Sequence, residues 1–275
     1  MSAAHQKPPL REVFARRPRM KKRARTDIMN DKLLLYELLK RYDLRGVLVD
    51  AAVWVLCADN AVRSLDDICL GNLDGGHQMT DHLKTALESL GVDCSATTAT
   101  VRFSLDEAFF VHYALNALHL YELDYNADTP DAIVRLDTGA AWKRFSEVRP
   151  DFRLLYATYH HFRGKGWLAR TGLQYGADFT LYQRHPALCH SDYSVLIQTP
   201  DAPTSSYGLG PMSRPPASWH TIQVTNRLTT QVGKRLLIVN IHDDRPELGY
   251  DDHKCLDRLE VSEYLVRRWV PERGR

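Results

Sequence analysis

Long apolar runs are missing from this 275-residue sequence. No stretch approaches the roughly 18 uninterrupted apolar residues that a membrane-spanning helix needs. Even the most apolar stretch, Leu44 to Ala58, contains Arg45 and Asp50. Charged residues make up 25% and hydrophobic residues 44% of the chain, which is typical of a soluble globular protein. We therefore expect no membrane association.

Cysteine is scarce and follows no pattern. The five cysteines are odd in number and scattered along the chain: Cys57, Cys69, Cys94, Cys189 and Cys255. No Cys-x-x-Cys pair or zinc-like spacing occurs, and the sequence shows no secretory signal peptide. These absences predict free thiols in a reducing compartment, with no structural metal and no cofactor.

Acidic residues are almost absent from the first 26 residues. This segment carries nine Lys or Arg against Glu12 alone, a net charge of +8, so the rest of the chain sums to −6 because the whole chain carries +2. Pro8, Pro9 and Pro18 break any helix here, and we expect residues 1–26 to be a disordered basic tail. Its cluster Arg16 to Arg23 resembles a nuclear localisation signal, which predicts the nucleus. Two alternatives are that the tail contacts RNA and that it is a solvated segment without a binding partner.

Residues 27–148 carry both helix-like and strand-like patterns, and we assign them to an N-terminal α+β domain. Apolar periodicity predicts these elements in chain order: a helix over Asp31–Tyr42, one or two buried strands over Val47–Leu56, a short helix over Thr80–Leu90, and helices over Leu105–Tyr121 and Asp137–Glu147. Ser104 and Glu107 have the spacing of a capping box, in which each side chain accepts a backbone amide at a helix start.

The pattern changes near Pro150, which suits the first turn of a helix that continues to about Arg163. The elements predicted after this helix are strands over Ala177–Tyr182, Tyr193–Gln198, Arg235–His242 and Val261–Val270, a flexible loop over Thr199–Ser218, and a helix over Trp219–Val232. We therefore place a second domain at residues 149–275. The expected fold class is α+β: an N-terminal mixed α/β domain followed by a small mixed β-sheet domain flanked by helices.

Three side chains at predicted strand entries make a chemically useful set: Tyr175, His190 and Lys234. Each alone has an ordinary explanation, but together they can cleave RNA without a metal. Histidine, with an ordinary pKa near ~6.5, can donate a proton to the departing 5′-oxygen. Tyrosine, near ~10, acts as the base toward the ribose 2′-OH only where a cation stabilises its phenolate, and lysine supplies that charge. The products would be a 2′,3′-cyclic phosphate and a 5′-hydroxyl.

Seven ordered motifs extend this set over more than half of the chain. They are Ser-Leu-Asp-Glu-Ala-Phe-Phe (104–110), Trp-Lys-Arg-Phe (142–145), Tyr-His-His-Phe-Arg-Gly-Lys-Gly-Trp (159–167), Gly-Leu-Gln-Tyr-Gly-Ala-Asp-Phe (172–179), Cys-His-Ser-Asp-Tyr-Ser-Val (189–195), Arg-Leu-Thr-Thr-Gln-Val-Gly-Lys (227–234) and Arg-Arg-Trp-Val (267–270). Together they resemble the tRNA-splicing endonuclease family, in particular its eukaryotic catalytic subunit that cuts the 5′ splice site.

The resemblance implies that Tyr175, His190 and Lys234 form the catalytic triad of an endonuclease domain at residues 149–275. It also implies that Arg227 and Arg268 grip a splice-site base by cation–π stacking, for which a planar guanidinium is suited. The substrate would be pre-tRNA. The partners would be a second catalytic subunit and structural subunits of a heterotetramer, joined through C-terminal strands such as the one predicted over Val261–Val270.

Three other interpretations stand beside this one. The chain could be the sister catalytic subunit that cuts the 3′ splice site, because that subunit shares the triad. It could be a non-catalytic subunit that scaffolds tRNA, although such subunits lose triad residues. A metal-dependent nuclease would use carboxylates such as Asp178 and Asp192, but the acids near the site have no supporting metal-ligand spacing.

Overall fold

The computed structural model describes residues 37, 39–73, 85, 87–91, 98–124, 132–198, 217–243, 245 and 248–267. The predicted basic tail, most of the helix predicted over Asp31–Tyr42, nearly all of the predicted loop over Thr199–Ser218, and Arg268 lie outside the described residues. Only part of the helix predicted over Thr80–Leu90 is described, and residues 85 and 87–89 are helical there.

The first sheet has six strands in the order β3-β4-β2-β1-β5-β6. Its strands are β1 (Leu44–Val49), β2 (Ala52–Ala58), β3 (Asn72–Leu73), β4 (Thr98–Ser104), β5 (Leu118–Asp124) and β6 (Ala132–Leu136). β1 and β5 run parallel, and the other neighbours are antiparallel. The segment predicted as one or two strands over Val47–Leu56 is therefore two strands, which form the hairpin β1–β2.

The second sheet has five strands in the order β11-β10-β9-β8-β7. Its strands are β7 (Leu168–Thr171), β8 (Phe179–Tyr182), β9 (Tyr193–Gln198), β10 (Arg235–Asp243) and β11 (Leu259–Leu265). β9 and β10 run parallel, and the other pairs are antiparallel. Two mixed sheets with helices confirm the α+β fold class. The predicted strand over Tyr193–Gln198 is confirmed at both ends, whereas β7 was not predicted.

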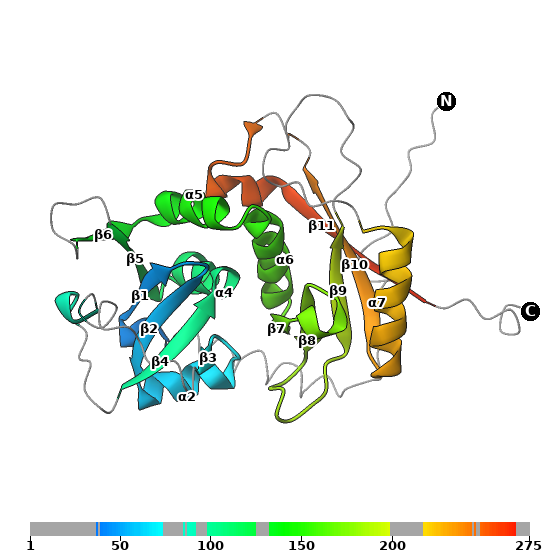
Figure 1. The fold of residues 1–275 in the computed structure, drawn as a ribbon, viewed down its shortest axis with the longest axis horizontal. Coiled ribbons are helices and arrows are strands. Elements are labelled where there is room, and N and C mark those ends of the chain that lie inside the picture. Colours follow the sequence, from blue (N-terminus) through cyan, green and yellow to red (C-terminus); the bar gives the residue numbers. More distant parts are fainter. Residues whose placement is uncertain are drawn as a thin grey trace, which may run out of the picture.

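Two helices flank the second sheet. Helix α6 (Phe152–Gly164) lies between the two sheets, and α7 (Trp219–Gln231) covers the outer face of the second (Figure 1). Successive side chains of a strand point to opposite faces of the sheet, so one strand can contact a helix on each face. In β9, Val195 and Ile197 belong to the large core that includes α6, whereas Leu196 packs with Ile222 of α7. Both predicted helices are confirmed to within two residues.

An aromatic cluster connects the helices that lie between the sheets. The ring centroid of Phe109 in α4 (Leu105–Phe109) lies 5.3 Å from that of Trp142 and 6.1 Å from that of Phe145, both in α5 (Thr138–Val148). The same ring lies 5.7 Å from Phe152 and 4.7 Å from Tyr156 of α6. Edge-to-face geometry is favourable for such pairs. The division at residue 149 stays a prediction, and this cluster joins segments on both sides of it.

Local signals at helix starts were accurate. Ser104 accepts a hydrogen bond from the Glu107 amide at 3.3 Å, and the Glu107 carboxylate accepts one from the Ser104 amide at 3.0 Å. The predicted capping box is therefore present, and α4 begins directly after it. The helix predicted over Asp137–Glu147 is also confirmed, with Asp137 as the N-cap of α5.

The helix predicted over Leu105–Tyr121 is wrong beyond its first half. After α4 the chain forms one π-helical segment, Phe110–Ala114, and leaves the helix at Leu115. Asn116 adopts a positive φ of 49°, and β5 then pairs in parallel with β1. Leu118 and Leu120 are buried on the core side of this strand. The apolar periodicity that predicted a helix here included Leu120, which also fits the two-residue alternation of a strand.

Helix α2 (Asp59–Asp67) completes the N-terminal half. Short 3₁₀ turns lie at Lys40–Tyr42, Leu173–Tyr175 and His253–Arg258. Among the described residues, no helix is long and apolar enough to cross a membrane.

Candidate active site

Tyr175 lies in a tight turn between β7 and β8. Gly172 opens this turn, and its carbonyl accepts hydrogen bonds from the amides of Tyr175 at 2.8 Å and Ala177 at 3.2 Å. A Cβ atom on Gly172 would lie 2.8–2.9 Å from backbone atoms of Ala177 and Phe179, so only glycine fits. Gly176 closes the turn at a φ of +65°. The two glycines that flank the tyrosine in the sequence therefore fix the backbone that presents it.

Helix α7 contacts the same turn. The Thr225 hydroxyl donates a hydrogen bond to the Gly176 carbonyl at 3.3 Å, and Thr225 is buried. The helix ends at Gln231, and Gly233, two residues later, has a φ of +71°. Its last carbonyls are satisfied because the Gly233 amide bonds to Thr230 and the Lys234 amide to Thr229. This C-cap places Lys234 directly before β10, as predicted.

Lys234 and Tyr175 meet in space. The Lys234 ammonium lies 4.5 Å from the centroid of the Tyr175 ring, within cation–π range. Lys234 is only 8% exposed, and no hydrogen bond or ion pair joins its ammonium to the residues that the structure describes. The ammonium of Lys234 therefore faces the Tyr175 ring and has no carboxylate partner among the described residues.

His190 lies at the start of the neighbouring strand. It stands three residues before β9, and the Asp192 carbonyl accepts a hydrogen bond from the Arg235 amide at 3.1 Å. Since β9 and β10 are parallel and pair Tyr193 with Arg235, His190 and Lys234 both precede the same end of the sheet. His190 is exposed and makes no side-chain hydrogen bond to the described part of the chain. The fold therefore leaves this imidazole accessible to a substrate.

The two arginines predicted to bind RNA have different outcomes. Arg227 is exposed on α7, on the opposite side from the helix residues Ile222, Thr225 and Thr229 that face the sheet. Its side chain is thus available to solvent. Arg268 lies outside the described residues, so the predicted pairing of the two stays untested.

The carboxylates of the rival metal-dependent interpretation are differently placed. Asp178 accepts a hydrogen bond from the Ile197 amide at 2.7 Å, so one of its oxygens serves the connection between β8 and β9. The amide of Asp192 bonds to the Leu181 carbonyl at 2.9 Å. In the described segments, no three His, Cys, Asp or Glu side chains gather as metal ligands would.

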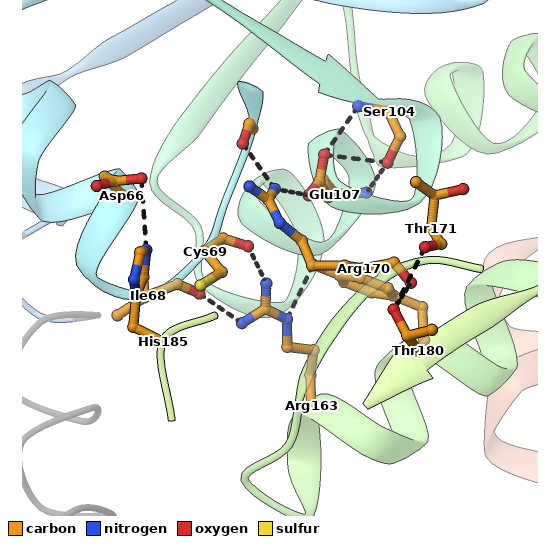
Figure 2. Close-up of polar contacts among 12 residues, drawn as sticks. Asp66, Ile68, Cys69, Ser104, Glu107, Arg163, Arg170, Thr171, Thr180 and His185 are labelled. Carbon is orange, nitrogen blue, oxygen red and sulfur yellow. Dashed lines mark hydrogen bonds and ion pairs between the residues drawn. The ribbon is translucent and has the colours of Figure 1, made fainter. Parts of the chain in front are cut away.

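A polar junction between the two halves was not predicted from the sequence. Figure 2 shows Arg163 of α6 and Arg170 of β7 directed at the segment that follows α2. Arg163 donates to the carbonyls of Ile68 at 2.7 Å and Cys69 at 2.6 Å, and Arg170 donates to the Gly71 carbonyl at 2.8 Å. Arg163 is buried within one of the seven motifs, which is the only local hint, because its partners lie 94 and 95 residues away.

Residues 152–250 match the family described as tRNA intron endonuclease, catalytic C-terminal domain. The matched range includes Tyr175, His190 and Lys234, together with α6, α7 and the strands β7 to β10. This match defines the class of the second half: it is the catalytic domain of an RNA-cutting enzyme family.

Similarity to whole proteins extends further along the chain. The tRNA-splicing endonuclease subunit Sen2 of Gallus gallus is 37% identical over 177 residues, which are 64% of this chain and 35% of that protein. Subunit Sen2-1 of Arabidopsis thaliana is 34% identical over 179 residues, which are 64% of this chain and 66% of that protein. The chain thus spans about a third of the vertebrate relatives and about two thirds of the plant relative. It belongs to the tRNA intron endonuclease family, through the catalytic domain at residues 152–250.

Proposed function

We propose that this chain is the catalytic subunit of a tRNA-splicing endonuclease that cuts pre-tRNA at the 5′ splice site. The observation that carries the proposal is the contact of the Lys234 ammonium with the Tyr175 ring, beside the strand entry that holds His190. Among the described residues, Lys234 has no ion-pair partner. The relatives with the printed name Sen2 support the choice of subunit.

In the proposed reaction, Tyr175 takes the proton of the ribose 2′-OH, and the freed oxygen attacks the adjacent phosphorus. His190 protonates the 5′-oxygen as the P–O bond to it breaks. Lys234 stabilises the phenolate, and its charge also offsets the negative charge that grows on the phosphorane oxygens. The products are a 2′,3′-cyclic phosphate and a 5′-hydroxyl, and no metal takes part.

Substrate grip and assembly belong to the same proposal. Arg227 and Arg268 hold a splice-site base between their guanidinium groups. β11 is the edge strand of the second sheet, with one side paired to β10, and Tyr264 on it is 53% exposed. An open strand edge of this kind can pair with another chain. We propose that β11 contacts a partner subunit of a heterotetramer that acts in the nucleus.

The reaction is tested with complex purified through this chain and a pre-tRNA substrate. A 2′-deoxy residue at the 5′ junction should abolish cleavage there and leave the 3′ junction cut, and EDTA should have no effect. Loss of cleavage in EDTA together with cutting of the deoxy substrate would instead establish the metal-dependent interpretation.

The subunit assignment is tested with His190→Ala. This variant should assemble and bind pre-tRNA normally but fail to cut the 5′ junction, whereas the matched control His220→Ala, an exposed histidine of α7, should cut it. Failure at the 3′ junction would assign the chain to the sister subunit. Normal cutting at both junctions would assign it a scaffolding role.

A further inference from the structure

The chain segment that carries His190 is held at few points. It connects β8 to β9 over residues 183–192, and it returns to the sheet where the Asp192 amide bonds to the Leu181 carbonyl at 2.9 Å. Because the His190 side chain has no hydrogen-bond partner in the described part of the chain, its position depends on the backbone of this segment. Whatever fixes that backbone therefore also sets the region that the imidazole can reach.

His185 is the centre of the segment. Its carbonyl accepts a hydrogen bond from the Leu188 amide at 2.8 Å, and its ring Nδ1 accepts one from the Ala187 amide at 3.2 Å. The Cys189 thiol, next to His190, donates to the Arg184 carbonyl at 3.3 Å. These bonds fold residues 184–189 into a compact turn that ends directly at His190.

The free edge of the His185 ring faces the other half of the molecule. Since Nδ1 accepts a hydrogen bond from an amide, the ring proton of the neutral imidazole is on Nε2. This Nε2 lies 3.6 Å from Oδ1 of Asp66, in the last turn of α2 (Figure 2). At 3.6 Å the contact is longer than a hydrogen bond, and with a neutral imidazole it joins the carboxylate to the ring dipole.

The side chain of Asp66 is 56% exposed, and the backbone that follows it is anchored. Two and three residues later, Ile68 and Cys69 give their carbonyls to the buried Arg163, and Gly71 gives its carbonyl to Arg170. These arginines come from α6 and β7, next to β8. The junction therefore ties the end of α2 to the second sheet, and Asp66 extends from that anchored end toward the segment of His190.

We propose that His185 and Asp66 are positioning residues for His190. The pair holds the turn at 184–189 against the N-terminal half, so the imidazole at its end stays aligned with the departing 5′-oxygen. This inference rests on the proposed function, in which His190 is the general acid. It gives the N-terminal half a role in the chemical step of the catalytic domain.

The test compares variants of Asp66 in the purified complex under single-turnover conditions with saturating pre-tRNA. Asp66→Ala should slow cleavage at the assigned junction by about threefold or more, since small displacements of a reacting group reduce rates strongly. Binding of pre-tRNA should not change. Asp66→Glu should restore part of the rate, and the matched control Asp67→Ala, an exposed acid on the same helix, should behave as the wild type. His185→Ala should repeat the defect of Asp66→Ala.

A substrate with sulfur in place of the bridging 5′-oxygen isolates the role of the acid. A thiolate leaves without protonation because thiols are far more acidic than alcohols. Asp66→Ala should therefore cut this substrate at nearly the wild-type rate. An equal slowing on both substrates, or a wild-type rate on the oxygen substrate, would overturn the inference while leaving the proposed function intact. Wild-type complex that cuts neither substrate would overturn the proposed function and this inference with it.

Discussion

Replacing Asp106 with asparagine should change how the stability of the fold depends on pH. Asp106 lies in α4 with 3% of its surface exposed, and its Oδ1 atom has no hydrogen-bond partner in the described structure. It lines a cavity of about 140 Å³ between the two halves. Burial raises the pKa of this carboxyl from 3.8 to about 7, against a smaller opposing effect of Arg149.

The direction follows from proton linkage. Between these two pKa values the folded state binds a proton that the unfolded state has lost, so the free energy of unfolding falls as the pH rises. Integration from about pH 5 to pH 8 gives a loss of about 3 kcal/mol for the wild type. Asparagine does not titrate, so Asp106→Asn avoids this loss. Any effect of its amide on the free energy of unfolding is the same at every pH.

Urea unfolding of both proteins at the two pH values measures this difference. The free energy of unfolding of Asp106→Asn relative to the wild type should increase by about 3 kcal/mol from pH 5 to pH 8. For 275 residues with an unfolding entropy of about 0.6 kcal/mol/K, the equivalent change in relative Tm is about 4–5 °C. The exposed Asp67→Asn should show no such change. A stability difference that stays constant with pH would refute the reasoning.

Two further substitutions address the turn and the junction. Gly172→Ala should cost about 1–3 kcal/mol of stability and reduce cleavage, because the new methyl group would meet backbone atoms at 2.8–2.9 Å, whereas Gly164→Ala, with open space around it, should be nearly neutral in thermal unfolding and cleavage assays. Arg163→Met should cost about 3 kcal/mol or more in urea unfolding, because it leaves the carbonyls of Ile68 and Cys69 without their donor in a buried site. A loss below about 1 kcal/mol for Arg163→Met would show that water replaces the guanidinium there.

Elements with strong local signals could be predicted from the sequence. The capping box at Ser104, the glycine at 233 and the β-branched run from Tyr193 each determine structure within a few residues, and the helices and strands next to them are where they were expected. β5 could not be predicted, because its pairing with β1 joins residues more than 70 positions apart. The alternation of Leu118 and Leu120 is too short to exclude a helix without that partner strand.

In the candidate site, too, some residues have local sequence signals and others depend on tertiary packing. Tyr175 and Lys234 are marked by the turn residues around them, and the fold brings their side chains together. The contacts of Asp66, Arg163 and Arg170 leave no comparable mark, since each depends on the packing of one half against the other. Carbonyl acceptors carry no residue identity at all, so no pattern of side chains could indicate them.

Two other cations of the second half, the buried Arg163 and the half-buried Lys165, show how Lys234 differs. Arg163 is satisfied by two carbonyls, and Lys165 donates to the buried carboxylate of Glu263 at 2.5 Å. Burial lowers the stability of any charge that lacks such partners. Lys234 has no ion-pair partner among the described residues, and its ammonium faces the Tyr175 ring instead. In the proposed reaction, the scissile phosphate supplies the negative charge that Lys234 lacks among the described residues.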